Sequence, residues 1–81
     1  MIFLIEYNRP KGQIITFSRF KDTDRIKAEK KRFELELDLN RKKVNHEVVL
    51  LEAATESLLR RTHRRYFESL KDIAKSTGAK Y

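Results

Sequence analysis

The sequence contains no cysteine and no tryptophan, and it has one proline and two glycines among its 81 residues. Without cysteine the chain can form no disulfide, no thiolate metal site and no cysteine nucleophile. The two glycines, Gly12 and Gly78, are too few and too far apart for a phosphate-binding glycine loop. No spacing typical of a metal site or of a nucleophile elbow occurs either. We therefore expect neither a metal nor a cofactor.

Long apolar runs are also absent. The longest, over residues 1–5 and 48–51, fall far short of the roughly 20 residues that a membrane-spanning helix requires. No basic region precedes the first run, as it would in a secretory signal peptide, and Glu6 interrupts it early. Together with the missing cysteines, these features favour a cytoplasmic protein with no membrane partner.

What the sequence does contain is charge. Nineteen Lys and Arg residues oppose twelve Asp and Glu residues, which gives a net charge of +7, while 40% of the residues are hydrophobic. A chain of this size buries only roughly 60% of the surface that its unfolded form exposes. We expect a single domain over residues 1–81, frayed over residues 77–81, whose stability benefits from a partner.

Three apolar segments predict β-strands. Residues 2–7 are almost all apolar, which is typical of an interior strand with two buried faces. Residues 13–20, rich in Ile, Thr and Phe, form the second segment, and Pro10 and Gly12 between the two suit a tight hairpin turn. Residues 46–53 predict a third strand, which is again apolar on both faces.

Two helices complete the prediction. The first runs from about residue 22 to about residue 43, because good helix formers dominate there and no Gly or Pro intervenes. Residues 33–39 alternate strictly between apolar and acidic, which is a strand signature, but Leu and Glu are poor strand formers and we favour the helix. The second helix begins after a cap at Thr55 and continues to about Ser76.

The element order ββαβα predicts an α+β fold with a three-stranded antiparallel or mixed sheet. The right-handed crossover rule makes the third strand parallel to the second. Placing the third strand beside the first then gives the sheet order 2-1-3. We expect both helices on one face of this sheet, with apolar side chains left on the other. The arrangement is common among small domains and does not by itself assign a function.

The apolar residues of the first helix form two stripes on nearly opposite sides, at about 100° per residue. One stripe contains Ile26, Phe33 and Leu37, and the other contains Ala28, Leu35 and Leu39. A helix with two apolar stripes needs cover on both sides, and its own sheet supplies only one cover. We therefore expect a homodimer whose interface contains Ala28, Leu35 and Leu39.

The second helix carries an arginine-rich segment over residues 58–67. Residues 55–81 hold seven basic and three acidic side chains, a net charge of +4. On a continuous helix one face holds Arg60, Arg64, Lys71 and Lys75, and a neighbouring row, partly paired with Glu68 and Asp72, holds Arg61 and Arg65. Such a row can contact successive phosphates, and arginine adds bidentate geometry. The alternative is a solvated face that keeps the protein soluble.

These features favour a small non-enzymatic module that binds RNA or DNA phosphates through Arg60, Arg61, Arg64, Arg65, Lys71 and Lys75. One alternative is a metal-independent endoribonuclease, in which His63 is the general acid or base and Tyr66 or His46 assists it. For both histidines we favour a structural role, with His63 half-buried beside an aromatic ring and His46 exposed at the start of a strand. Another alternative is an adaptor for an acidic protein.

The aromatic residues of the predicted hairpin offer a further possibility. Phe3, Tyr7, Phe17 and Phe20 could stack on the bases of a single strand. The sheet needs those rings for its core, however, so we expect them to pack inside the domain.

Overall fold

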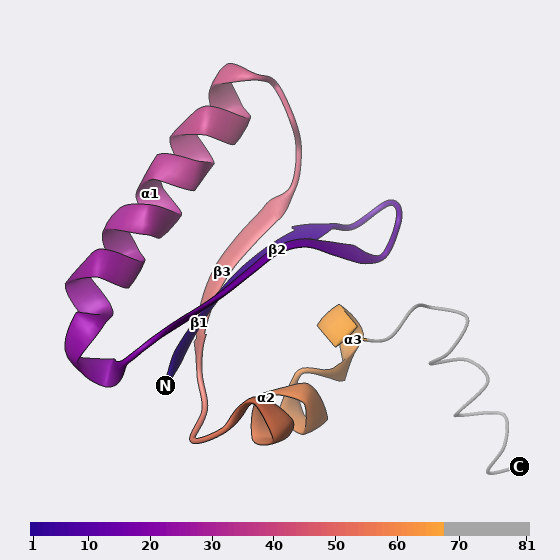
Figure 1. The fold of residues 1–81 in the computed structure, drawn as a ribbon. Coiled ribbons are helices and arrows are strands. Elements are labelled where there is room, and N and C mark those ends of the chain that lie inside the picture. The colour runs from indigo at the N-terminus through magenta and orange to yellow at the C-terminus, as the bar shows by residue number, and fades with distance from the viewer. Residues whose placement is uncertain (68–81) are drawn as a thin grey trace, which may run out of the picture.

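The computed structural model describes residues 1–67 as a small sheet with helices on both sides (Figure 1). Its strands are β1 (Ile2–Asn8), β2 (Gln13–Phe20) and β3 (Glu47–Glu52). A 3-10 turn, η1 (Asp22–Asp24), leads into α1 (Arg25–Arg41), and β3 is followed by α2 (Glu56–Thr62) and α3 (Arg64–Phe67). None of the helices in these residues is long and apolar enough to cross a membrane. The expected helical segment up to Ser76 and the expected frayed end lie outside the described residues.

The sheet has the order β2-β1-β3, and β1 runs antiparallel to both of its neighbours. This confirms the α+β class, the strand order and the central position of the first strand. The burial of β1 explains that position, because residues 2–7 are all buried. Side chains of a strand alternate between its two faces, so six consecutive buried residues require cover on both.

The helices lie on opposite faces of the sheet, so the expectation that they share one face is wrong (Figure 1). On one face, Leu59 of α2 and Tyr66 of α3 join Phe3, Ile5 and Tyr7 of β1 in a buried cluster. On the other face α1 packs over the even-numbered side chains, and the small cavities beneath it are lined by residues such as Leu4, Leu35, Leu39 and Val48. The physical reason is that β1 is apolar on both faces, and each face needs its own cover.

Both apolar stripes of α1 are present, but the stripe expected at a dimer interface faces the chain's own sheet, and the other stripe is exposed. Ala28 and Leu39 are buried and Leu35 is half-buried, so the chain's own sheet covers the residues expected at a dimer interface. The exposed stripe is the other one, with Ile26 82% exposed, Phe33 58% and Leu37 45%. The helix over residues 33–39 is confirmed.

A β-bulge determines which side chains of β2 face α3. Tyr7 pairs with Ile14, whereas the preceding residue, Glu6, pairs with Thr16, so Ile15 is an extra residue in β2. A bulge breaks the two-residue alternation of a strand. Ile14 and Phe17 are three positions apart and would otherwise lie on opposite faces, but both pack against the cluster beneath α2 and α3.

Two chain reversals use the left-handed backbone region. Gly12, with φ of 62°, lies in the β1–β2 turn, where glycine adopts this conformation at little steric cost. Lys43, with φ of 57°, ends α1. There the Lys43 amide donates to the Asn40 carbonyl at 3.1 Å and the Val44 amide donates to the Leu39 carbonyl at 2.9 Å. This is the Schellman pattern, which usually places glycine where Lys43 stands.

Candidate nucleic-acid interface

The arginine-rich segment forms two short helices rather than one continuous helix, which corrects the expectation for residues 55–67. His63 follows α2 with φ of −125° and ψ of 51°, and α3 begins at the next residue. The Thr62 hydroxyl donates to the Leu58 carbonyl at 2.9 Å, a local bond that competes with regular helix geometry. Arg60 and Arg64 therefore belong to separate helices and do not line one continuous helix face.

Glu47, the first residue of β3, holds α3 on the sheet. One carboxylate oxygen accepts hydrogen bonds from the Tyr66 hydroxyl and, at 2.8 Å, from Arg65 Nη2. The other oxygen accepts from Arg9 Nε at 2.7 Å. The Tyr7 hydroxyl adds a bond to the Arg65 carbonyl at 3.0 Å. Four residues cannot sustain a helix in isolation, so these contacts account for the position of α3.

The same contacts shift the titration of two groups. Burial alone would raise the pKa of Glu47, but the hydrogen bonds from Tyr66 and Arg9 and the positive charges of Arg65 and Arg9 outweigh it, so the pKa of this carboxyl lies below its ordinary value of 4.5. Burial and the bond to Glu47 raise the pKa of Tyr66 above its ordinary value of 10.0. Near neutral pH the site therefore holds a carboxylate and a neutral phenol.

Glu56, in the first turn of α2, is a second carboxylate between two arginines. Its Oε1 lies 3.1 Å from Arg19 Nη2, an ion pair without a well-aligned hydrogen bond, and its Oε2 accepts from Arg60 Nε at 3.2 Å. The Thr55 side chain caps the helix by accepting from the Leu58 amide at 3.1 Å. The predicted cap is thus confirmed. Glu56 also gives Arg60 an acidic partner that the sequence analysis does not assign to it.

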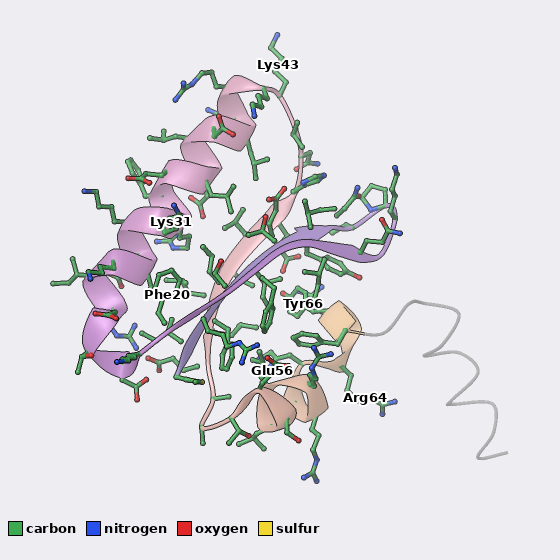
Figure 2. All side chains as sticks on the ribbon, viewed as in Figure 1. Phe20, Lys31, Lys43, Glu56, Arg64 and Tyr66 are labelled. Atoms are coloured by element: carbon green, nitrogen blue, oxygen red, sulfur yellow. The ribbon has the colours of Figure 1, made fainter. Side chains whose placement is uncertain are left out.

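Two of these arginines also lie over aromatic rings of α3. The Arg60 guanidinium lies 4.6 Å from the ring centroid of Phe67, and the Arg65 guanidinium lies 4.3 Å from that of Tyr66. Arg61 and Arg64 are exposed, and Figure 2 shows Arg64 pointing away from the sheet. The other predicted binding residues, Lys71 and Lys75, lie outside the described residues, as do the partners expected for Arg61 and Arg65, Glu68 and Asp72.

The two histidines lie on opposite faces of the sheet. His46 is half-buried rather than exposed, on the α1 side, with its Nδ1 2.5 Å from Oε2 of Glu6. His63, between α2 and α3, is also half-buried, and its Nδ1 lies 2.9 Å from the Thr62 hydroxyl. The geometry therefore does not bring together the histidine pair that the ribonuclease alternative invoked. Its other candidate, Tyr66, has its hydroxyl bonded to Glu47.

The roles of three carboxylates were not predicted from the sequence. For Glu6 the sequence does contain an indication, since it is the one charge within a strand predicted to be buried on both faces. Its Oε1 accepts a hydrogen bond from the Thr16 hydroxyl at 2.8 Å. Glu47 and Glu56 left no such signal, because their arginine partners are distant in the sequence and become neighbours only through the strand order and the helix placement.

The geometry assembles a cationic surface. Four arginines share two carboxylates: Arg9 and Arg65 at Glu47, and Arg19 and Arg60 at Glu56. Within residues 1–67 no group of three or more His, Asp or Glu side chains could hold a metal ion. Comparison of the chain with protein-family models, with curated proteins and with solved structures finds no match.

Proposed function

We propose that this chain is a small, basic, non-enzymatic binding module of the cytoplasm that contacts the phosphates of RNA or DNA. The sharing of Glu47 and Glu56 among four arginines is the observation that supports it. Each carboxylate carries one negative charge and holds two positive ones, so every shared site retains a positive charge. The contact surface comprises the β1–β2 turn, the end of β2 with Arg19, and the helices α2 and α3.

Further basic side chains extend this surface. Lys11 in the β1–β2 turn is exposed, and so are Arg61 in α2 and Arg64 in α3. Lysine and arginine side chains that reach phosphates release condensed counterions, which makes such binding favourable and sensitive to salt.

A charge-reversal experiment tests this proposal. The double variant Arg61→Glu with Arg64→Glu reverses two exposed charges on α2 and α3. Its matched control, Lys27→Glu with Lys31→Glu, makes the same change in net charge on exposed positions of α1 outside its apolar stripe. Titration of a fluorescently labelled RNA, followed by anisotropy at two salt concentrations, should show binding weakened roughly tenfold or more by the first variant and far less by the control.

Two results would contradict the proposal. Equal losses in both variants would mean that net charge, rather than this surface, determines the binding. Absence of binding to RNA and to DNA at low salt would remove nucleic acid as the partner and leave an acidic protein as the alternative occupant of the same surface.

We also propose that the module is a homodimer. Its support is the exposed stripe of α1, where Ile26, Phe33 and Leu37 present large apolar side chains along one side of a helix. Scattered exposed apolar residues are ordinary, but a contiguous row on one element marks an interaction surface. A second copy would cover this row and leave the arginines, on the other side of the sheet, accessible to an anionic partner.

A further inference from the structure

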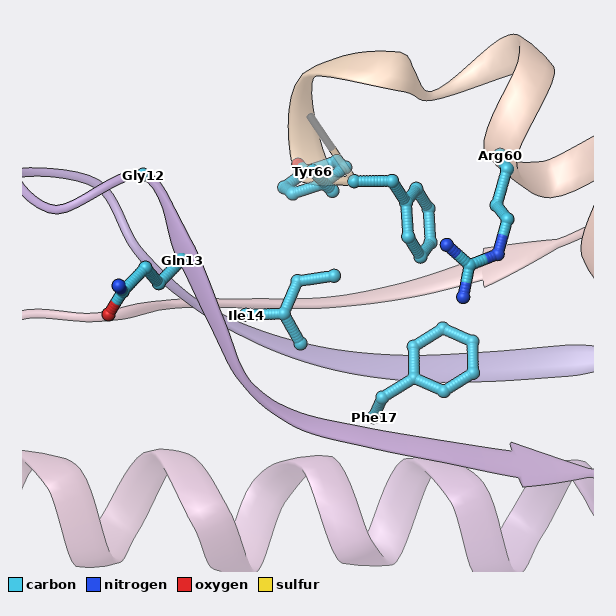
Figure 3. Close-up of a pocket in the computed structure, with 7 residues that line it drawn as sticks. Gly12, Gln13, Ile14, Phe17, Arg60 and Tyr66 are labelled. Atoms are coloured by element: carbon cyan, nitrogen blue, oxygen red, sulfur yellow. The ribbon is translucent and has the colours of Figure 1, made fainter. Parts of the chain in front are cut away.

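A cavity of about 540 Å³ lies between the beginning of β2 and the helices α2 and α3 (Figure 3). Gly12, Gln13, Ile14 and Phe17 line it from the strand and the turn before it, and Arg60, Tyr66 and Phe67 line it from the helices. Figure 3 shows the Arg60 side chain extending from α2 toward the ring of Phe17. The bulge at Ile15 creates this wall, since it directs both Ile14 and Phe17 to the α3 side.

Three of the seven residues that line the cavity are aromatic, namely Phe17, Tyr66 and Phe67. Phe17 and Phe67 meet edge to face, with their centroids 5.7 Å apart and their planes at 77°. Both side chains are half-buried, so each is incompletely covered by the rest of the chain. Aromatic ring faces and guanidinium planes are the surfaces on which unpaired nucleic-acid bases stack.

The charge at this cavity suits an anionic ligand. Arg60 belongs to its wall, and Glu56, which holds Arg60 by its Nε, is shared with Arg19. Lys11 is exposed in the turn directly before Gly12. A base inside the cavity would therefore have basic side chains beside it for its adjacent phosphate. A base within a duplex is paired and stacked, so it cannot enter without leaving the helix.

We infer that this cavity receives one unpaired base of a single-stranded nucleic acid, stacked on Phe67 with its edge toward Phe17, and with the neighbouring phosphate near Arg60. The inference rests on the proposed nucleic-acid binding and narrows it to single strands. The phosphate contacts alone would accept single strands and duplexes alike.

The experiment compares a labelled single-stranded RNA of about 12 nucleotides with the duplex of the same sequence. The wild-type protein should bind the single strand more tightly. Phe67→Leu removes the stacking ring and should weaken single-strand binding roughly tenfold, while duplex binding stays within twofold. Phe20→Leu is the matched control. Phe20 is half-buried on the same strand but pairs with Ile2 on the α1 side, so its loss should change neither affinity.

A second variant avoids removing a ring from the core. Ile14→Trp places a larger side chain into the cavity from β2 and should weaken single-strand binding to a similar extent, even if Phe67→Leu does not fold. Equal wild-type affinities for single strand and duplex would overturn the inference while leaving the proposed phosphate binding intact. Unchanged single-strand binding in a folded variant would overturn it as well. Absence of binding to either form would instead reject the proposed function and this inference together.

Discussion

Glu6 is a carboxylate at the centre of the sheet, with a side chain only 6% exposed. An ionised carboxylate removed from water is costly unless hydrogen bonds compensate it. Here the Thr16 hydroxyl donates a hydrogen bond to one carboxylate oxygen, and the Nδ1 atom of His46 lies within hydrogen-bond distance of the other. The three residues come from three different strands or their ends, so this cluster ties both edge strands to β1 beneath α1.

Replacing Glu6 by Gln should therefore destabilise the fold. The amide keeps the shape of the side chain but loses the charge-assisted bonds, and we expect a cost of about 1–3 kcal/mol. The free energy of unfolding in urea measures it. Glu29→Gln, at an exposed position of α1, is the control and should stay within about 0.5 kcal/mol of wild type. A Glu6→Gln variant as stable as this control would show that the buried cluster contributes nothing.

Lys43 offers a stabilising substitution. Its left-handed conformation is unfavourable for a residue with a Cβ by roughly 1–2 kcal/mol, whereas glycine adopts it freely. Glycine also gains entropy in the unfolded chain, which offsets part of the benefit. Lys43→Gly should thus raise the free energy of unfolding by up to about 1 kcal/mol, while Lys43→Ala should not. The substitution does not touch the candidate interface, because Lys43 lies at the end of α1, far from α2 and α3 (Figure 2). A gain with alanine equal to that with glycine would contradict this explanation.

Among the elements, α3 depends most on tertiary contacts. It has four residues, Tyr66 is its buried side chain, and Glu47 holds both Tyr66 and Arg65. Its attachment should therefore depend on pH through Glu47. Below 4.5 the unfolded carboxyl binds a proton while the folded one, with its lowered pKa, does not. Stability therefore rises with pH in this range. The contribution of Glu47 is complete above 4.5 and disappears as the pH falls through the folded value.

Urea unfolding of wild type and Glu47→Gln over a series of acidic pH values measures this contribution. We expect the wild type to lose more stability than the variant as the solution is acidified. At the alkaline end the raised pKa of Tyr66 predicts the opposite direction, with stability present below 10.0 and lost as the pH rises through the folded value. Identical acid losses in wild type and variant would show that Glu47 does not anchor α3.

Elements were largely predictable from the sequence, and irregularities within them were not. The apolar run of β1 and the uninterrupted helix formers of α1 each carry a local signal, and both elements exist where that signal lies. The bulge at Ile15 carries no such signal, since the flanking residues suit a regular strand equally well. The break between α2 and α3 at His63 also carries no local signal. It involves the hydrogen bond of the Thr62 hydroxyl and the contacts of α3 with Glu47, and helix propensity describes neither.

At the scale of the whole molecule, the sequence predicts the strand order but not the helix placement. Crossover handedness constrains strands, whereas the faces that helices cover depend on total apolar area on each side of the sheet. The contacts of the candidate site could likewise not be predicted from the sequence. Its arginines are visible in the sequence, yet their pairing with Glu47 and Glu56 requires knowing that β3 and α2 lie beside Arg9 and Arg19.

The exposed stripe of α1 yields a prediction about assembly. Light scattering at micromolar concentration should give twice the monomer mass for the wild type, and Phe33→Glu should give the monomer mass, because a charge at the centre of an apolar interface remains unpaired. Lys31→Glu, an exposed change on the same helix, should leave the dimer intact. A monomeric wild type would refute the homodimer, and the stripe would then need another explanation.

The sharing of one carboxylate by two arginines also bears on how an anion could arrive and leave. Arg9 is 69% exposed, whereas Glu47 is 11% exposed and holds Arg65 and Tyr66 besides Arg9. If a phosphate binds here as we propose, Arg9 can turn to it while Glu47 keeps Arg65 and Tyr66 as donors, so that no partly buried charge is left without a partner. Such an exchange of Arg9 between two acceptors would need no opening of the fold, which would favour rapid capture and rapid release over long residence.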